Sequence, residues 1–282
     1  MMRYVLTILI LLLTVPTFGQ TNGLDLTVRA VPEDAPTAFQ MFDKFVDVFG
    51  IPIYASASVP DAKILHAAHV MAQYLDNNAD GEVDNPAVVE AMIENHASLI
   101  MFNREGEEEQ FDESAEMLFE QGVELQLLYG FETLPTGDNE FDTTLEEVLH
   151  LITHAGYAYA YPDIWGEEPG TAVSLAMDEA RGGFFDGVPR QYPDDAWYSY
   201  DDRTCEYDCQ ISEYIYWALT SLLGGQDFVG RLEEIGHEWR LNTPEKLQAT
   251  DSRIYALLTN PEYAFPTILP DGAYEVSQQP ED

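Results

Sequence analysis

The segments Ser98-Leu-Ile-Met-Phe102 and Val123-Glu-Leu-Gln-Leu-Leu-Tyr129 each predict a β-strand, because both are short, apolar runs of a length typical of strands. The acidic stretch between them, residues 107–119, has helical spacing. The apolar runs at residues 26–31 and 51–55 also indicate strands. The first half of the chain is therefore expected to contain a small sheet.

Helical spacing is the commoner pattern on both sides of these strands. It predicts helices over residues 36–49, 61–75, 144–158, 173–180, 211–223 and 228–239, and Asn85-Pro86 is typical of a cap and first residue of another. Residues after 240 contain many prolines and predict mostly loop. We therefore expect an α+β fold, with a small sheet in the first half followed by a predominantly helical second half. No internal repeat or low-complexity linker interrupts residues 20–282, which predicts a single domain.

The N-terminus has the features of a secretory signal. Arg3 precedes an apolar run, residues 5–15, that is shorter than the roughly 20 residues needed to cross a bilayer. Small residues then precede Gln20, where a signal peptidase would cut. We predict a signal peptide over residues 1–19 and a mature protein that is secreted or periplasmic.

The composition is strongly acidic. Asp and Glu number 51 against 12 Lys and Arg, a formal net charge of −39, while hydrophobic residues make up 46% of the 282 and suffice for a core. Such a charge repels phosphate backbones and anionic lipids, so neither nucleic acid nor membrane is expected as a partner. A small-molecule, peptide or glycan ligand stays open. Cys205 and Cys209 predict a short-range disulfide in an oxidising compartment.

The segment Asp76-Asn-Asn-Ala-Asp-Gly-Glu-Val-Asp84 predicts a calcium loop. Oxygen-bearing side chains recur at the spacing that suits a hard cation, and Gly81 stands where the backbone must turn sharply. The expected calcium ligands are Asp76, Asn78, Asp80, Glu82 and Asp84.

This segment resembles the EF-hand and dockerin-like calcium loops over residues 76–87. The resemblance implies a helix on each side and a structural calcium ion. Position 12, where the family places a bidentate acid, is Ala87. Weak binding is therefore expected, with water or Glu90 completing the coordination. The alternative is a solvated turn between two helices.

Two histidines one helical turn apart form the second motif. His150 and His154 lie on the same face of the predicted helix, and Glu147 projects along the same stripe. Imidazoles at this spacing are typical of zinc ligands on a helix. A third ligand is expected from another element. Glu213 is the best candidate, because a carboxylate within an apolar helix needs a partner; Asp178 and Glu179 come next.

The histidine segment, residues 147–154, resembles the active-site helix of zincin metallopeptidases in its two histidines. That resemblance implies a zincin-like fold and zinc held by His150 and His154, with Glu213 as the third ligand expected from its own surroundings or Glu147 as an alternative third ligand. The family's Glu beside a histidine is replaced by Leu151 and Thr153. Glu147 is then the candidate general base, acting from one turn upstream. The alternatives are that a Glu of this segment closes a capping box at the helix start, and that the histidines are only hydrogen-bonded in the core.

Two functions are compatible with these motifs. One is a secreted metal-dependent hydrolase, a zinc metallopeptidase-like enzyme, with a structural calcium site. The other is a non-catalytic secreted binding protein that calcium stabilises. They differ in whether the two imidazoles and a distant acid meet around one ion.

Overall fold

The computed structural model describes residues 24–134 and 141–277; the predicted signal peptide, residues 1–19, lies outside them. A four-stranded sheet has the order β1-β2-β3-β4. Strands β1 and β2 form an antiparallel hairpin, and β2, β3 and β4 run parallel. The strands are β1 (Lys44–Val48), β2 (Ile51–Ala55), β3 (Ser98–Phe102) and β4 (Leu125–Tyr129).

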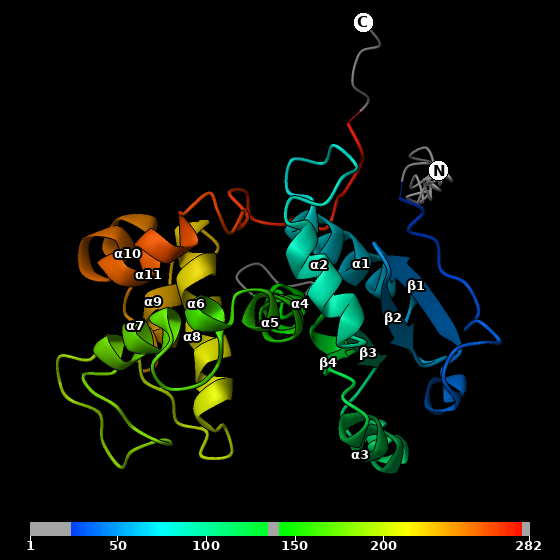
Figure 1. Cartoon of the computed structure of the whole chain (residues 1–282), viewed down its shortest axis with the longest axis horizontal. Helices are drawn as coiled ribbons and strands as arrows, with labels where there is room; N and C mark the ends of the chain where they lie inside the picture. The colour runs from blue at the N-terminus through cyan, green and yellow to red at the C-terminus, as the bar shows by residue number, and fades with distance from the viewer. Residues whose placement is uncertain (1–23, 135–140, 278–282) are drawn as a thin grey trace, which may run out of the picture.

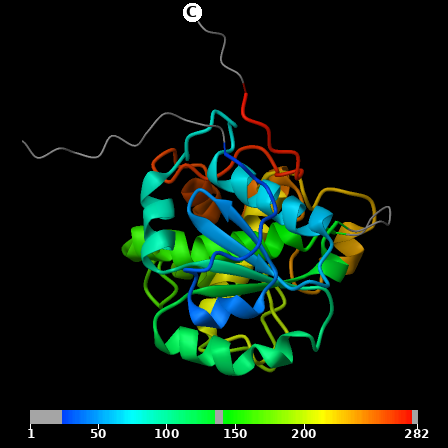
Figure 2. The ribbon, with the colours of Figure 1, turned by 90° about the vertical axis from the view of Figure 1, so that its right-hand side faces the viewer.

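Helices connect the parallel strands, as parallel pairing requires. Two of them, α1 (Asp61–Leu75) and α2 (Pro86–Glu94), lead from β2 to β3. The next, α3 (Asp112–Glu120), leads from β3 to β4. Figure 2 views the molecule from the side on which the sheet lies. Asn85 caps α2 by accepting the Val88 N–H, and Pro86 is its first residue, as the sequence predicts.

One helical segment joins the two halves of the molecule. It comprises α4 (Thr144–Ile152), the π-helical turn η4 (Thr153–Tyr157) and α5 (Ala158–Ala160). In Figure 1 it lies between the sheet with its helices α1, α2 and α3 and the helices of the second half, and α4 contacts β4, α1 and the long helix α8 (Tyr207–Leu222). Gly156 allows close packing on α2, because a Cβ there would lie 2.7 Å from Val88 Cγ1.

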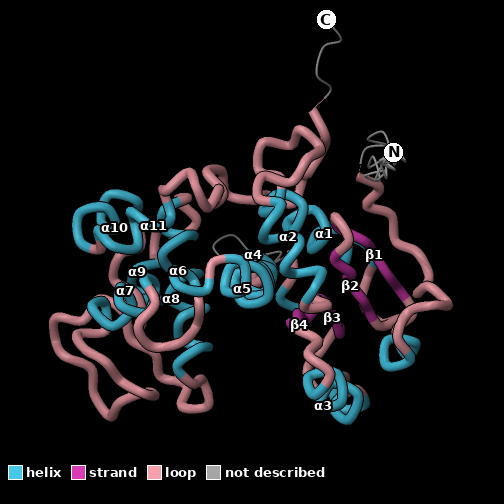
Figure 3. Tube along the Cα trace, in the orientation of Figure 1, coloured by secondary structure: helices cyan, strands magenta, loops and turns pink. Residues whose placement is uncertain are grey.

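The second half is predominantly helical, as Figure 3 shows. The α+β prediction is thus confirmed. Besides α8, the helices of the second half are α6 (Pro162–Trp165), α7 (Ala172–Ala180), α9 (Arg231–Ile235), α10 (Pro244–Thr250) and α11 (Ser252–Leu258). Among the described residues, the first half also contains three short 3₁₀ turns, η1 (Thr37–Met41), η2 (Glu108–Gln110) and η3 (Gly130–Glu132). The main apolar core includes side chains from the sheet, α1, α4, α8 and α11.

Three local predictions were wrong. The helix expected over residues 36–49 is instead a 3₁₀ turn followed by β1, because Phe49 (φ 53°) and Gly50 (φ 88°) close a tight hairpin there. The strand expected at residues 26–31 is only an isolated pairing of Arg29 with Phe45. The C-terminal region contains α10 and α11, which Thr243 and Asp251 cap with their side chains.

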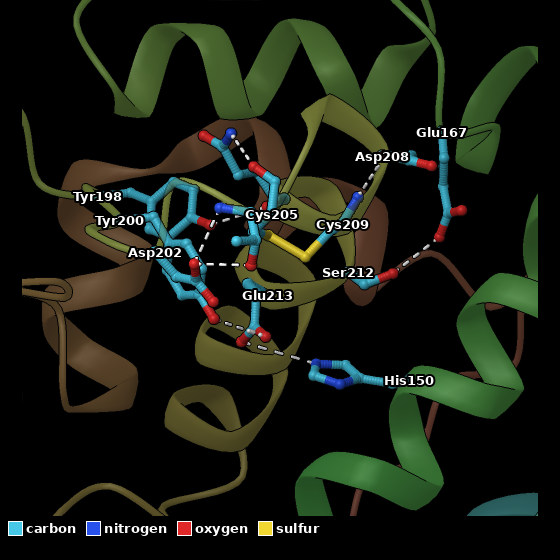
Figure 4. Close-up of a disulfide and its surroundings, with 12 residues drawn as sticks. His150, Glu167, Tyr198, Tyr200, Asp202, Cys205, Asp208, Cys209, Ser212 and Glu213 are labelled. Carbon is cyan, nitrogen blue, oxygen red and sulfur yellow. Dashed lines mark hydrogen bonds and ion pairs between the residues drawn. A yellow bond between two sulfur atoms is a disulfide. The ribbon is translucent and has the colours of Figure 1, made fainter. Parts of the chain in front are cut away.

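The predicted disulfide is present. Cys205 and Cys209 are bonded, with their Cα atoms 5.3 Å apart, at the beginning of α8. Figure 4 shows this bond next to the residues of α8 that face α4. Within the described residues, the structure has no helix of the length and apolarity that crossing a membrane demands.

Candidate metal centre

The beginning of α4 leaves its two glutamates free for other contacts. Asp142 Oδ1 accepts the Thr144 N–H at 3.1 Å, and Thr143 makes no side-chain cap. The other oxygen of Asp142, Oδ2, is hydrogen-bonded to His66 Nε2 of α1. Because Thr143 makes no side-chain cap and Thr144 Oγ1 has no hydrogen-bond partner among the described residues, neither Glu146 nor Glu147 is engaged in a capping box there.

His150 is the centre of a carboxylate group at the contact of α4 with α8. Its ring is 8% exposed, and its Nε2 has no hydrogen-bond partner among the described residues. The nearest carboxylate oxygen to Nε2 is Glu213 Oε2, at 3.7 Å. Glu146 completes a group of three whose ligand atoms all lie within 4.8 Å of one another. Figure 4 shows His150 and Glu213 pointing toward each other.

Hydrogen bonds from Tyr200 and Gln126 position the two carboxylates that flank His150, those of Glu213 and Glu147. The Tyr200 hydroxyl donates to Glu213 Oε1 at 3.0 Å, which leaves Oε2 facing His150. Glu147 lies on the other edge of the imidazole, with its Oε2 3.8 Å from His150 Nδ1, and accepts a hydrogen bond from Gln126. The imidazole is therefore flanked by a carboxylate at each nitrogen, at distances too long for hydrogen bonds.

His154 makes the opposite kind of contact. Its Nδ1 is hydrogen-bonded to Glu167, and its Nε2 lies 3.1 Å from Glu124 Oε2. Ser212 donates to the second oxygen of Glu167 at 2.8 Å. Both ring nitrogens are thus occupied, and the structure does not bring His154 into the group around His150. The third member of that group is Glu146, in the position expected from the sequence for His154.

The pKa values of both histidines are raised to a similar value, although the causes differ. Hydrogen bonds to Glu124 and Glu167 raise the pKa of His154 to about 10, which makes it an imidazolium at neutral pH. Burial lowers the pKa of His150, but the charges of Glu213, Glu147 and Glu146 outweigh burial and raise it to about 10. Burial, together with the charge of Glu213, raises the pKa of Glu146 to about 8. Burial also raises the pKa of Glu213.

The separation of His150 from Glu213 is longer than a charged hydrogen bond and leaves space between the two atoms. A protonated imidazole hydrogen-bonds carboxylates at about 2.7–2.9 Å, whereas the Nε2 to Oε2 distance is 3.7 Å. An ion about 2.1 Å from both atoms would fit this separation at an angle of about 120°. One imidazole and two carboxylates are a ligand set that suits zinc and leaves a position for water.

A groove of about 620 Å³ borders Glu146, whereas His150 and Glu213 do not line it. Glu146 and Tyr216 line it, and the Tyr216 ring packs edge-on against His150 with centroids 5.8 Å apart. The groove would give a substrate access to an ion bound beside Glu146. Its other lining residues are Phe131, Glu132, Phe141, Thr143, Trp217, Arg231, Glu234, Ile235 and His237.

The sequence patterns missed several of these residues. Glu146 stands one turn before His150, a spacing that could have marked it as a ligand. Glu124 and Glu167 lie outside helices and carry no local signal. A second, more exposed group consists of Asp201, His237 and Glu238. Asp178, an alternative third ligand, instead pairs with Arg181 at 2.6 Å.

The predicted calcium ligands lie in a loop between α1 and α2. Asp76 is fully buried, and its oxygens accept the backbone N–H groups of Asp80 and Gly81 at 3.1 and 2.8 Å. Asp84 accepts the N–H of Asn77 at 2.7 Å and the side-chain amide of Asn78 at 3.2 Å. Gly81 has φ 92°, the conformation for which glycine is needed.

Asp80 and Glu82 complete this loop on its exposed side. Asp80 Oδ1 accepts the Glu82 N–H at 2.9 Å. Burial and the charges of Asp76 and Asp80 raise the pKa of Asp84. In the described residues, no three acids of the loop have ligand atoms all within 4.8 Å, so calcium would have to draw them closer.

The C-terminal segment is fastened to the calcium loop. The Tyr274 hydroxyl donates to Asp76 Oδ2 at 2.6 Å, and the Ser277 N–H donates to the Ala79 carbonyl at 2.7 Å. Asn77 accepts the N–H of Ile268 at 2.9 Å. Order in the loop is therefore coupled to the position of the C-terminal segment.

Comparison of the chain with protein-family models, with curated proteins and with solved structures finds no match. The candidate site is therefore argued from its own geometry.

The His154→Gln variant is expected to lose stability in a pH-dependent way. The pKa of His154 rises on folding from 6.5 to about 10, so the stabilisation is fully present below pH 6.5 and disappears as the pH rises through 10. With 41% of the side chain exposed, we expect a deficit of about 1–2 kcal/mol at pH 6. Urea unfolding at pH 6 and pH 10 measures it; an equal deficit at both values would contradict a charged His154.

Proposed function

We propose that this protein is a secreted metal-dependent hydrolase with its metal, zinc, at Glu146, His150 and Glu213. The observation that carries the proposal is the buried His150 Nε2, which has no partner among the described residues and faces Glu213 across 3.7 Å. Polar atoms buried in this way are paired in folded proteins, or they face a ligand. The adjoining groove supplies a place for the substrate.

Zinc at this centre would lower the pKa of a bound water toward 7 and so supply hydroxide. Glu147, expected from the sequence to be the base, lies at the Nδ1 edge of His150, away from Glu213. We therefore assign Glu147 to orienting the imidazole, as carboxylates do for metal-bound histidines, a role in which its Oε2 would have to approach Nδ1 from the present 3.8 Å to hydrogen-bond distance. The zincin-like arrangement expected from His150 and His154 is not part of this proposal, because both ring nitrogens of His154 contact Glu124 and Glu167. Peptide hydrolysis is proposed from the ligand set Glu146, His150 and Glu213 and the groove beside Glu146.

Calcium belongs to the same proposal as a structural ion. The support is the Asp76–Asp84 loop, in which the backbone N–H groups of Asp80 and Gly81 donate to the Asp76 carboxylate. The disulfide of Cys205 and Cys209 supports export to an oxidising compartment. The charge of −39 supports a protein without nucleic-acid or membrane partners.

The experiment is a hydrolysis assay on metal-defined protein. Apo, zinc-loaded and Glu213→Gln protein would be incubated with a mixed peptide library and the products read by mass spectrometry. We expect cleavage by the zinc form, with a decrease of at least about 100-fold in the apo form and in the variant. Zinc uptake without any cleavage would refute the hydrolase and leave the metal centre.

The second candidate is a non-catalytic binding protein that calcium stabilises. It is favoured by one observation: Leu151 and Thr153 occupy the places of a neighbouring base, and Glu147 faces away from Glu213. The same assay separates the two, because this candidate takes up ions without cleaving any peptide.

A further inference from the structure

The groove beside the candidate metal centre has an acidic and aromatic wall. Glu132, Glu146 and Glu234 line it, and the aromatic side chains are Phe131, Phe141, Tyr216 and Trp217. Arg231 is the one Lys or Arg among its lining residues. The two charges of a zinc ion would be neutralised by Glu146 and Glu213. Of the remaining charged lining residues, Glu132 and Glu234 are negative and Arg231 is positive, so the groove keeps a net negative charge.

Arg231 illustrates how this wall holds a cation. It is 5% exposed, and its guanidinium lies 4.7 Å from the centroid of the Phe141 ring. Its NH1 is 3.0 Å from Glu234, and its Nε donates to Gln226 at 2.7 Å. A ring face and a carboxylate together bind this cation, which is a favourable pairing for guanidinium and ammonium groups.

Phe131 and Glu132 offer the same pair of groups on η3. The Lys63 ammonium reaches this turn, but it donates to the carbonyls of Gly130 and Thr133 and not to the Glu132 carboxylate. Phe131 is 52% exposed, so its ring is open to a ligand. Among the described residues, no ion pair joins a Lys or Arg to Glu132. Residues 135–140, which follow closely in the chain, contain no Lys or Arg either.

We infer that the groove binds a basic peptide, with a lysine or arginine side chain lying on Phe131 and paired with Glu132. This inference rests on the proposed function, since the bound peptide is taken to be the substrate. The long apolar stem of such a side chain covers the ring while its charged end meets the carboxylate. The acidic surface around the groove attracts the same peptides and repels acidic ones.

The test uses the zinc-loaded protein and three labelled five-residue alanine peptides whose central residue is lysine, glutamine or glutamate. Binding is measured by fluorescence anisotropy at low and high salt, and mass spectrometry checks that the peptides stay intact. Glu132→Gln is the test variant. Glu113→Gln on α3, which is exposed and removes the same charge, is the matched control.

We expect the lysine peptide to bind at least about 10-fold more tightly than the glutamate peptide, with the difference shrinking in high salt. Glu132→Gln is expected to weaken the lysine peptide about 5-fold and leave the glutamine peptide unchanged, whereas Glu113→Gln changes neither. Equal affinity of the three peptides, or an affinity for the lysine peptide that Glu132→Gln leaves unchanged, overturns the inference. Zinc content, measured in the same samples, tests the proposed function separately. Protein that retains no zinc would refute the proposed metal centre, independently of the peptide affinities.

Discussion

His150→Ala is expected to lower the affinity for zinc by on the order of 1,000-fold, because it removes the only imidazole among the three proposed ligands. The remaining acids, Glu146 and Glu213, bind zinc less selectively than a set that includes nitrogen. Competition with a chromophoric chelator at pH 7 measures the affinity. The variant also removes the positive charge that lies among Glu146, Glu147 and Glu213, so circular dichroism must first show that it is folded.

The control for this variant is His96→Asn, which removes an exposed histidine from a position with φ 52° that Asn tolerates. It should leave zinc affinity unchanged. His154→Gln is informative as well: with both its nitrogens on Glu124 and Glu167, it is expected to change affinity by less than about 10-fold. If His154→Gln lowers affinity as much as His150→Ala, the zincin-like pair of histidines is the true ligand set.

Calcium is expected to raise the melting temperature by about 3–10 °C at 10 mM. Extracellular modules bind with dissociation constants of about 10⁻⁴–10⁻³ M, so this concentration adds roughly 1.4–2.7 kcal/mol. In a domain of this size, about 1 kcal/mol corresponds to 2–4 °C. Because Tyr274 bonds to Asp76, hydrogen exchange in the C-terminal segment should slow as calcium binds.

Asp80→Asn tests whether the loop is responsible for this stabilisation. The amide oxygen can still accept the Glu82 N–H, while the charge is removed. The variant should keep its stability in chelator but lose most of the gain from calcium; Glu113→Gln again serves as the control. A calcium response that is unaltered in Asp80→Asn, or no response in the wild type, would show that residues 76–84 form only a turn.

Much of the fold is predictable from short-range patterns. Strands β2, β3 and β4 and the helices α1, α2, α4 and α8 follow from apolar periodicity and caps. Strand β1 was mistaken for a helix because Phe39, Phe42 and Val46 are spaced as on a helix face. That strand is decided by its turn at Phe49-Gly50 and by pairing with β2, neither of which periodicity detects.

The candidate site was predictable only in its parts on α4 and α8. Glu213 was found because a carboxylate within an apolar helix must be paired, and the structure places it at His150. The separation of His150 from His154 depends on Glu124 and Glu167, which come from distant segments without a local pattern. Helical spacing shows which residues share a face, but not which partners the rest of the chain brings to that face.

The most direct test of the account is a crystal structure of zinc-soaked protein with anomalous scattering recorded at the zinc edge. The account predicts one strong peak about 2.1 Å from His150 Nε2 and in contact with Glu213 and Glu146. A peak at His154, or none within bonding distance of His150, would contradict it.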